Sequence, residues 1–122
     1  MEDQVAERRH VSHDEIQTVT GRTFQASVLD ARGPVVVEFM SYGCAHCGVM
    51  EPVLQRVAAR LKGTETVVRV NVGVEQGLAE RYGIAGTPTM VVFSNGREVR
   101  RVEGPIPTAE NLFATLTQPS AT

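Results

Sequence analysis

The chain is organised around Ser41-Tyr42-Gly43-Cys44-Ala45-His46-Cys47, a stretch that holds both cysteines of its 122 residues. An apolar run, Val35 to Met40, precedes this stretch and has the composition of a buried strand. The run from Cys47 to Leu61 follows it and carries apolar residues at helical spacing. The sequence therefore predicts a pair of cysteines at the point where a strand turns into a helix.

The spacing of the two cysteines suits a redox-active dithiol. Side chains three residues apart on the first turn of a helix lie close enough to bridge. The unpaired N–H groups and positive dipole of a helix start favour a thiolate at Cys44, and the thiolate is the nucleophilic form. A protonated His46 would add to this effect. We therefore predict that Cys44 attacks a disulfide and that Cys47 resolves the mixed disulfide.

Two other uses of a Cys-x-x-Cys pair are possible. A zinc site would need a second cysteine pair or two suitably spaced histidines. The chain has no further cysteine, and His10 and His13 lie far upstream in a polar segment. A purely structural disulfide is also disfavoured, because a three-residue step closes almost no loop. We expect no metal and no cofactor.

Length and composition limit the class of protein. A chain of 122 residues is long enough for one domain with its own core. The net charge of −2 favours neither nucleic acid nor an anionic membrane surface as a partner. No run approaches the ~20 apolar residues of a membrane-spanning helix. The absence of a long exposed apolar run makes a monomer the expected state.

The first ten residues lack the apolar region of a signal peptide, so a cytoplasmic location is expected. In that compartment two cysteines are more often catalytic than structural. A mature form whose export signal had been removed would show the same sequence. The polar residues 1–14 are expected to form a flexible arm, residues 15–117 the folded domain, and residues 118–122 a flexible tail.

Hydrophobic periodicity and turn signals predict the remaining elements. The two strands predicted at residues 35–40 and 66–72 flank the helix and should be parallel, joined by a right-handed crossover. Pro52 should kink the helix without ending it. Asn95-Gly96 predicts a hairpin turn. The other predicted elements are a short strand at 15–19, short helices at 21–29 and 75–82, hairpin strands at 89–94 and 98–102, and a last helix capped by Thr108.

This order of elements, with the cysteines opening the second helix, resembles the thioredoxin family from about Glu15 to Leu116. The resemblance implies an α/β thioredoxin fold with a central mixed five-stranded sheet flanked by four helices. The motifs that carry it are Glu38-Phe39, Cys44-Ala45-His46-Cys47, Pro52, Gly83-Ile84-Ala85-Gly86-Thr87-Pro88-Thr89 and Asn95-Gly96.

The resemblance assigns a substrate-binding role to Gly86, Thr87 and Pro88. In this family the proline of the Thr-Pro step is cis and lies against the dithiol. A cis X-Pro bond usually marks a tight functional turn. Thr87 would then offer its backbone to an extended substrate segment. The alternative is an ordinary turn proline that starts a strand.

Glu38 occupies the position where the family carries a buried acid, usually aspartate, that accepts the proton of the resolving cysteine. Burial would raise the pKa of Glu38 and suit it to act as a general base near neutral pH. The alternative is a glutamate that points to solvent at a strand end. Arg69 matches a position where the family often has lysine, and it could pair with Glu38 or lie on the surface.

The resemblance implies a thiol–disulfide oxidoreductase acting on protein disulfides, in the form of a thioredoxin-type reductase in cell redox homeostasis. A flavoprotein of the thioredoxin-reductase type would then recycle it. The chain departs from typical thioredoxins, because Gly43 replaces their tryptophan and Ala45-His46 replaces their Gly-Pro. A histidine before the second cysteine is similar to disulfide isomerases and periplasmic oxidases.

Two alternatives to a reductase therefore stay open. One is a more oxidising disulfide oxidase or isomerase of an extracytoplasmic compartment, since stabilising the reduced thiolate makes a dithiol a better oxidant. The other is a non-catalytic binding module of thioredoxin fold that docks a partner through the face around Pro88. The intact pair Cys44 and Cys47 argues against the second, because such a module needs no dithiol.

Overall fold

The computed structural model describes residues 16–106 and 108–118. The predicted arm at 1–14 and residues 119–122 of the predicted tail lie outside this part of the chain. None of the described helices is long and apolar enough to cross a membrane. In chain order the elements are β1 (Gln17–Thr18), the π-helix η1 (Gln25–Leu29), β2 (Val35–Met40), α2 (Ala45–Leu61), β3 (Thr66–Asn71), α3 (Gln76–Arg81), β4 (Thr89–Ser94), β5 (Arg97–Glu103) and α4 (Ala109–Thr117).

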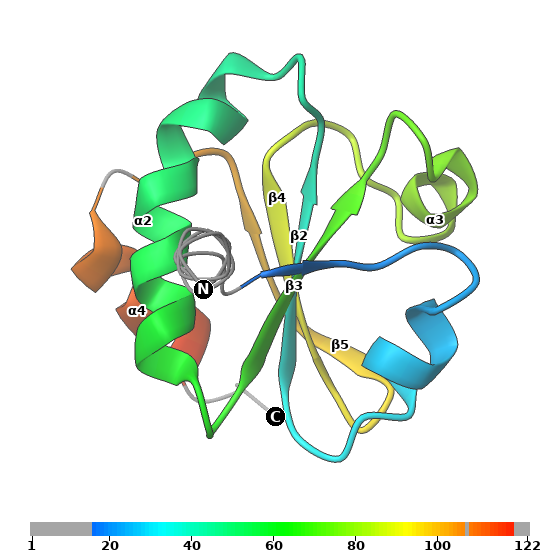
Figure 1. Ribbon diagram of the computed structural model, residues 1–122, viewed down its shortest axis with the longest axis horizontal. Helices are drawn as coiled ribbons and strands as arrows, with labels where there is room; N and C mark the ends of the chain where they lie inside the picture. The colour runs from blue at the N-terminus through cyan, green and yellow to red at the C-terminus, as the bar shows by residue number, and fades with distance from the viewer. Residues whose placement is uncertain (1–15, 107, 119–122) are drawn as a thin grey trace, which may run out of the picture.

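The strands form one mixed sheet in the order β1-β3-β2-β4-β5. Strands β1 and β2 both run parallel to β3, whereas β4 runs antiparallel to β2 and β5 antiparallel to β4. Helices α2 and α4 cover one face, and η1 and α3 lie on the other (Figure 1). The predicted five-stranded mixed sheet with four flanking helices is confirmed, as is the parallel pairing across the helix that follows the cysteines.

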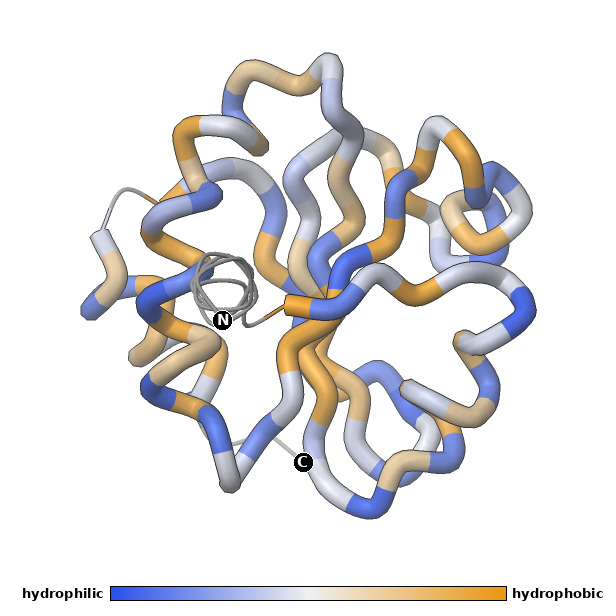
Figure 2. The backbone as a smooth tube through the Cα atoms, viewed as in Figure 1, coloured by the Kyte–Doolittle hydropathy of each residue, from blue (hydrophilic) through white to orange (hydrophobic). Residues whose placement is uncertain are grey.

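Strand β2 is the centre of the sheet, and all six of its residues are buried. Successive side chains of a strand point to opposite faces, so β2 serves two cores. Val35, Val37 and Phe39 belong to the core on the side of η1 and α3, and Val36 belongs to the core under α2 and α4. Glu38 lies two residues after Val36 and therefore points to the same face of the sheet. Its carboxyl group thus faces α2, the helix that carries the cysteines. Figure 2 shows the apolar central strands in orange.

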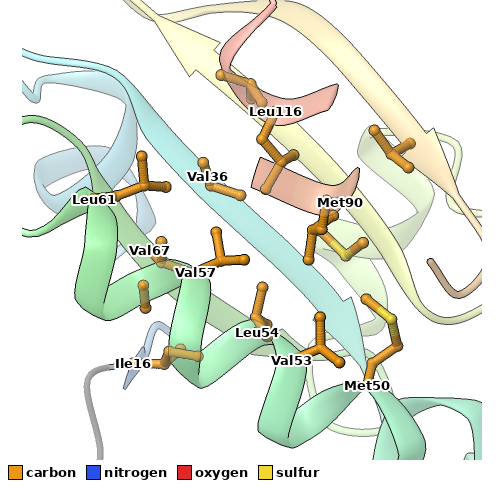
Figure 3. Packing of buried hydrophobic residues seen from close by; sticks show 14 residues of the cluster. Ile16, Val36, Met50, Val53, Leu54, Val57, Leu61, Val67, Met90 and Leu116 are labelled. Atoms are coloured by element: carbon orange, nitrogen blue, oxygen red, sulfur yellow. The ribbon is translucent and has the colours of Figure 1, made fainter. Parts of the chain in front are cut away.

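The core under α2 fixes this helix against the sheet. Leu54 and Val57 of α2 are fully buried and lie over Val36 of β2, with Leu116 of α4 nearby (Figure 3). Complete burial of a leucine or valine side chain contributes about 1.5–3 kcal/mol. The apolar stripe that predicted the helix therefore also holds the first turn of α2, with its cysteines, at the end of β2.

Three elements differ from the sequence prediction. The helix predicted at 21–29 is a single π-helical turn, because the Asp30 N–H bonds to the Gln25 carbonyl five residues earlier, at 2.8 Å. The predicted strand at 15–19 has only two residues in ladder pairing, β1. The hairpin turn has two residues, Asn95 and Gly96, both with positive φ (55° and 79°), so Arg97 already pairs in β5.

Candidate active site

Cys44 is the N-cap of α2. The helix begins at Ala45, between the two cysteines, where the sequence predicts its first turn, and the Cys44 sulfur accepts a hydrogen bond from the Cys47 N–H at 3.1 Å. This is the contact that serine or aspartate makes at helix starts, here made by a sulfur atom. It places Cys44 at the positive end of the helix, where β2 ends and α2 begins (Figure 1). The helix continues through Pro52 to Leu61.

The two thiols have different environments. Cys44 is partly exposed, and the burial of the rest of its surface raises its pKa. Hydrogen bonds from the side chains of Cys47 and Thr87, and from the backbone of Cys47 and His46, outweigh this effect. The net result is a pKa for Cys44 below the usual range of a thiol. Cys47 is buried, and burial together with its hydrogen bond to Cys44 raises its pKa to about 11. The outer sulfur is therefore the easier one to ionise, and the inner sulfur holds its proton.

His46 lies on the first turn of α2 with an exposed side chain. Its backbone N–H is one of the groups that lower the pKa of Cys44. An effect of its imidazole on Cys44 stays a prediction.

The loop before β4 lies against the dithiol. The Thr87–Pro88 peptide bond is cis, and the Cys44 thiol donates to the Thr87 carbonyl oxygen at 3.4 Å. The Thr89 hydroxyl donates to the Gly86 carbonyl at 2.6 Å and braces the turn. Gly86 is exposed, with open space around the position of a Cβ. The structure thus brings Thr87 next to Cys44, between an exposed Gly86 and a buried Pro88.

Glu38 is completely buried on β2, so the alternative in which it points to solvent is wrong. Neither carboxylate oxygen has a hydrogen-bond partner among the described residues, and the nearest cation, Arg69, holds its Nε 3.6 Å from Oε1. Burial raises the pKa of Glu38 to about 7; the Arg69 charge opposes this rise and the Glu51 charge adds to it. Such a carboxyl group can take up and release a proton at neutral pH.

Arg69 pairs in the ladder with Glu38 and is almost fully buried, so the surface position considered for it is wrong. Its NH2 group donates to both carboxylate oxygens of Glu51, at 2.8 and 2.6 Å. Glu51 was not among the site residues predicted from the sequence. Its position four residues after Cys47 was the available signal, since residues four apart share one face of a helix.

An open cavity of about 200 Å³ connects the dithiol with the pair formed by Arg69 and Glu51. Among the described residues, no group of three or more histidine, cysteine, aspartate or glutamate side chains could hold a metal ion. The cavity can therefore offer a nucleophilic sulfur, a second thiol and charged groups to a reacting disulfide. Its lining consists of Met40, Ser41, Tyr42, Cys44, Cys47, Gly48, Glu51 and Arg69.

Comparison with known proteins agrees with this geometry. The thioredoxin family model matches residues 15–118. Thioredoxin 1 of Nostoc sp. is 37% identical over 89 residues, which cover 73% of this chain and 83% of that protein. Thioredoxin 1 of Synechococcus elongatus is 35% identical over 89 residues, which again cover 73% of this chain and 83% of that protein.

Relatives of another name match as well. Protein disulfide-isomerase 2-3 of Arabidopsis thaliana is 37% identical over 86 residues, which cover 70% of this chain but only 20% of that longer protein. The family model and the two thioredoxins span most of both sequences. The chain therefore belongs to the thioredoxin family of thiol–disulfide oxidoreductases.

Proposed function

We propose that this chain is a protein-disulfide reductase of the thioredoxin type. The observation that carries the proposal is the position of Cys44, a partly exposed sulfur that caps α2 and has a lowered pKa. In the first step the Cys44 thiolate attacks one sulfur of the substrate disulfide. A mixed disulfide forms, the substrate S–S bond breaks, and the released substrate thiolate takes a proton from water.

In the second step Cys47 resolves the mixed disulfide. With a pKa of about 11, the Cys47 thiol needs a base to lose its proton near neutral pH, and the Glu38 carboxylate, with a pKa of about 7, accepts it. The Cys47 thiolate then attacks the Cys44 sulfur and releases the second substrate thiolate. The two electrons of the dithiol have passed to the substrate, and a Cys44–Cys47 disulfide has formed.

The backbone of Gly86 and Thr87, held in place by Pro88, binds the substrate next to the reacting sulfur. The Thr87 carbonyl accepts the Cys44 S–H in the reduced protein, and ionisation of Cys44 removes this donor. The carbonyl is then available to an N–H of an extended peptide, in the manner of strand addition. The exposed His46 lies beside the same opening and favours the Cys44 thiolate when it is protonated.

Repeated turnover needs a reductant for the Cys44–Cys47 disulfide. A flavoprotein of the thioredoxin-reductase type is the proposed partner, because it supplies two electrons to a dithiol of this kind. The proposed location is the cytoplasm, where a reducing thiol pool keeps such a dithiol in its active form.

A Cys47→Ala variant tests the mechanism. It should form a stable mixed disulfide between Cys44 and a protein disulfide, because nothing displaces the bound substrate chain. The adduct is detected by intact mass spectrometry after incubation with oxidised insulin, and dithiothreitol should release it. The wild-type chain is the control and should accumulate no adduct. Recovery of no adduct from the variant would contradict the proposed function.

A second candidate, an oxidase or isomerase, is favoured by the similarity to an Arabidopsis protein disulfide-isomerase and by the histidine before Cys47. The equilibrium of the dithiol with glutathione separates the two candidates. For a reductase we expect a potential near the ~−270 mV of thioredoxin, and for an isomerase one near ~−180 mV. Quenched samples analysed by mass spectrometry give the ratio of dithiol to disulfide.

A further inference from the structure

Two carboxylates compete for one guanidinium beneath the dithiol. Arg69 lies between Glu38 on β2 and Glu51 on α2. Its shortest contacts, 2.6 and 2.8 Å, are with the two oxygens of Glu51, whereas its nearest approach to Glu38 is 3.6 Å. A distance of 3.6 Å is beyond hydrogen-bond range. Glu51 therefore holds the arginine at hydrogen-bond distance, whereas the arginine acts on Glu38 from farther away.

Glu51 is itself held in place. The Gln55 side chain donates to Glu51 Oε2 at 2.7 Å, so this oxygen accepts bonds from both Gln55 and Arg69. Cys47, Glu51 and Gln55 are four residues apart and form one stripe along α2. The Glu51 side chain is 38% exposed and lines the cavity that reaches Cys47. Glu51 thus fixes the arginine from the solvent side of the cavity.

Within residues 16–106 and 108–118, the charged groups found to act on Glu38 are Arg69 and Glu51. Strand β3 contributes Arg69, helix α2 contributes Glu51, and β4 opposes Glu38 with Met90. The described residues of β4 include no charged side chain. Burial is the main cause of the raised pKa of Glu38, and the charges of Arg69 and Glu51 then shift this pKa in opposite directions.

We propose that Glu51 is a positioning residue which, by binding the Arg69 guanidinium, sets the pH range in which Glu38 exchanges a proton with Cys47. This inference rests on the proposed reductase mechanism. With Glu51 ionised, the arginine is directed away from Glu38, and the buried carboxyl group keeps its proton to higher pH. Without Glu51, the arginine can turn toward Glu38 and hold it as a carboxylate.

A Glu51→Gln variant tests the inference, because it removes the charge and keeps the size of the side chain. The reduced protein, labelled with ¹³C at the glutamate carboxyl carbons, is titrated by NMR, and Glu38→Gln identifies the Glu38 signal. We expect the Glu38 midpoint to fall by about one pH unit, through loss of a like charge and of the contact by which Glu51 holds Arg69. The acidic limb of the pH profile for the resolving step should shift in the same direction.

The matched control is Glu110→Gln, which removes one exposed negative charge on α4, away from the cavity. It should leave the Glu38 midpoint and the pH profile unchanged. Glu51→Ala also removes the contact with Arg69 and should shift the midpoint at least as far as Glu51→Gln does. An unchanged midpoint in both Glu51 variants would overturn the inference.

An Arg69→Gln background separates the role of the arginine from direct repulsion between the two carboxylates. In that background, Glu51→Gln should move the Glu38 midpoint by less than it does in the wild-type chain. A shift of equal size in both backgrounds would overturn the proposal. The titration needs no substrate, so it can be judged separately from the reductase activity. If the Glu38 midpoint is unchanged in the Glu51 variants while Cys47→Ala still forms adducts through Cys44, the proposed role of Glu51 is refuted and the reductase mechanism is not. If the Glu38 midpoint shifts in the Glu51 variants while Cys47→Ala forms no adduct, the coupling of Glu51 to Glu38 is supported and the reductase mechanism is refuted.

Discussion

A Cys44→Ser variant should lose turnover with protein disulfides by at least about a thousandfold, the scale seen when an enzyme loses its nucleophile. A serine oxygen cannot form the mixed disulfide that carries the reaction. The fold should be unaffected, because serine is among the best N-cap residues and its oxygen can accept the Cys47 N–H in place of sulfur. Reduction of insulin, followed by turbidity with excess dithiothreitol, measures the loss.

The Cys47→Ala variant is the matched control for this experiment. It too should fail to turn over, yet it should bind one equivalent of substrate covalently, whereas Cys44→Ser should bind none. Circular dichroism of both variants establishes that α2 is intact. If Cys44→Ser retained turnover, or formed an adduct through Cys47, the assignment of the outer sulfur as nucleophile would be wrong.

Replacing Glu38 with glutamine should stabilise the protein in alkaline solution relative to acid. The pKa of Glu38 rises from 4.5 to about 7 on folding, chiefly through burial. Between these values the folded state binds more protons than the unfolded state, so stability falls as the pH rises. The full penalty, about 3 kcal/mol, is present above pH 7 and absent below pH 4.5. Glutamine carries no charge and escapes it.

The measurement is the free energy of unfolding of wild type and Glu38→Gln in urea, at pH 4 and at pH 8. The variant-minus-wild-type difference should be about 3 kcal/mol more favourable at pH 8. Comparing two pH values cancels the pH-independent cost of burying an amide. An equal difference in the free energy of unfolding at both pH values would show that Glu38 ionises as an exposed glutamate does.

The Glu38→Gln variant should also resolve the mixed disulfide at least about tenfold more slowly at pH 7, as expected for loss of a general base.

The sequence determined the elements that depend on local patterns. The apolar run of β2, the apolar stripe of α2 and the turn at Asn95-Gly96 act between residues a few positions apart, and the structure contains all of them. The spacing of Cys44 and Cys47 likewise predicted a dithiol at a helix start. The N-cap contact from the Cys44 sulfur to the Cys47 N–H was not predicted, because capping is normally the role of an oxygen atom.

Only the tertiary structure decided how the dithiol is surrounded. Thr87 meets Cys44 across 43 positions, and Arg69 meets Glu51 across 18. Such contacts depend on the register of the parallel pair β2 and β3 and on the seating of α2 over it, and a single sequence does not record either. Local preference acts within a turn or a strand, whereas the pKa of a buried carboxyl group is set by the burial and the neighbouring charges that the fold gives it.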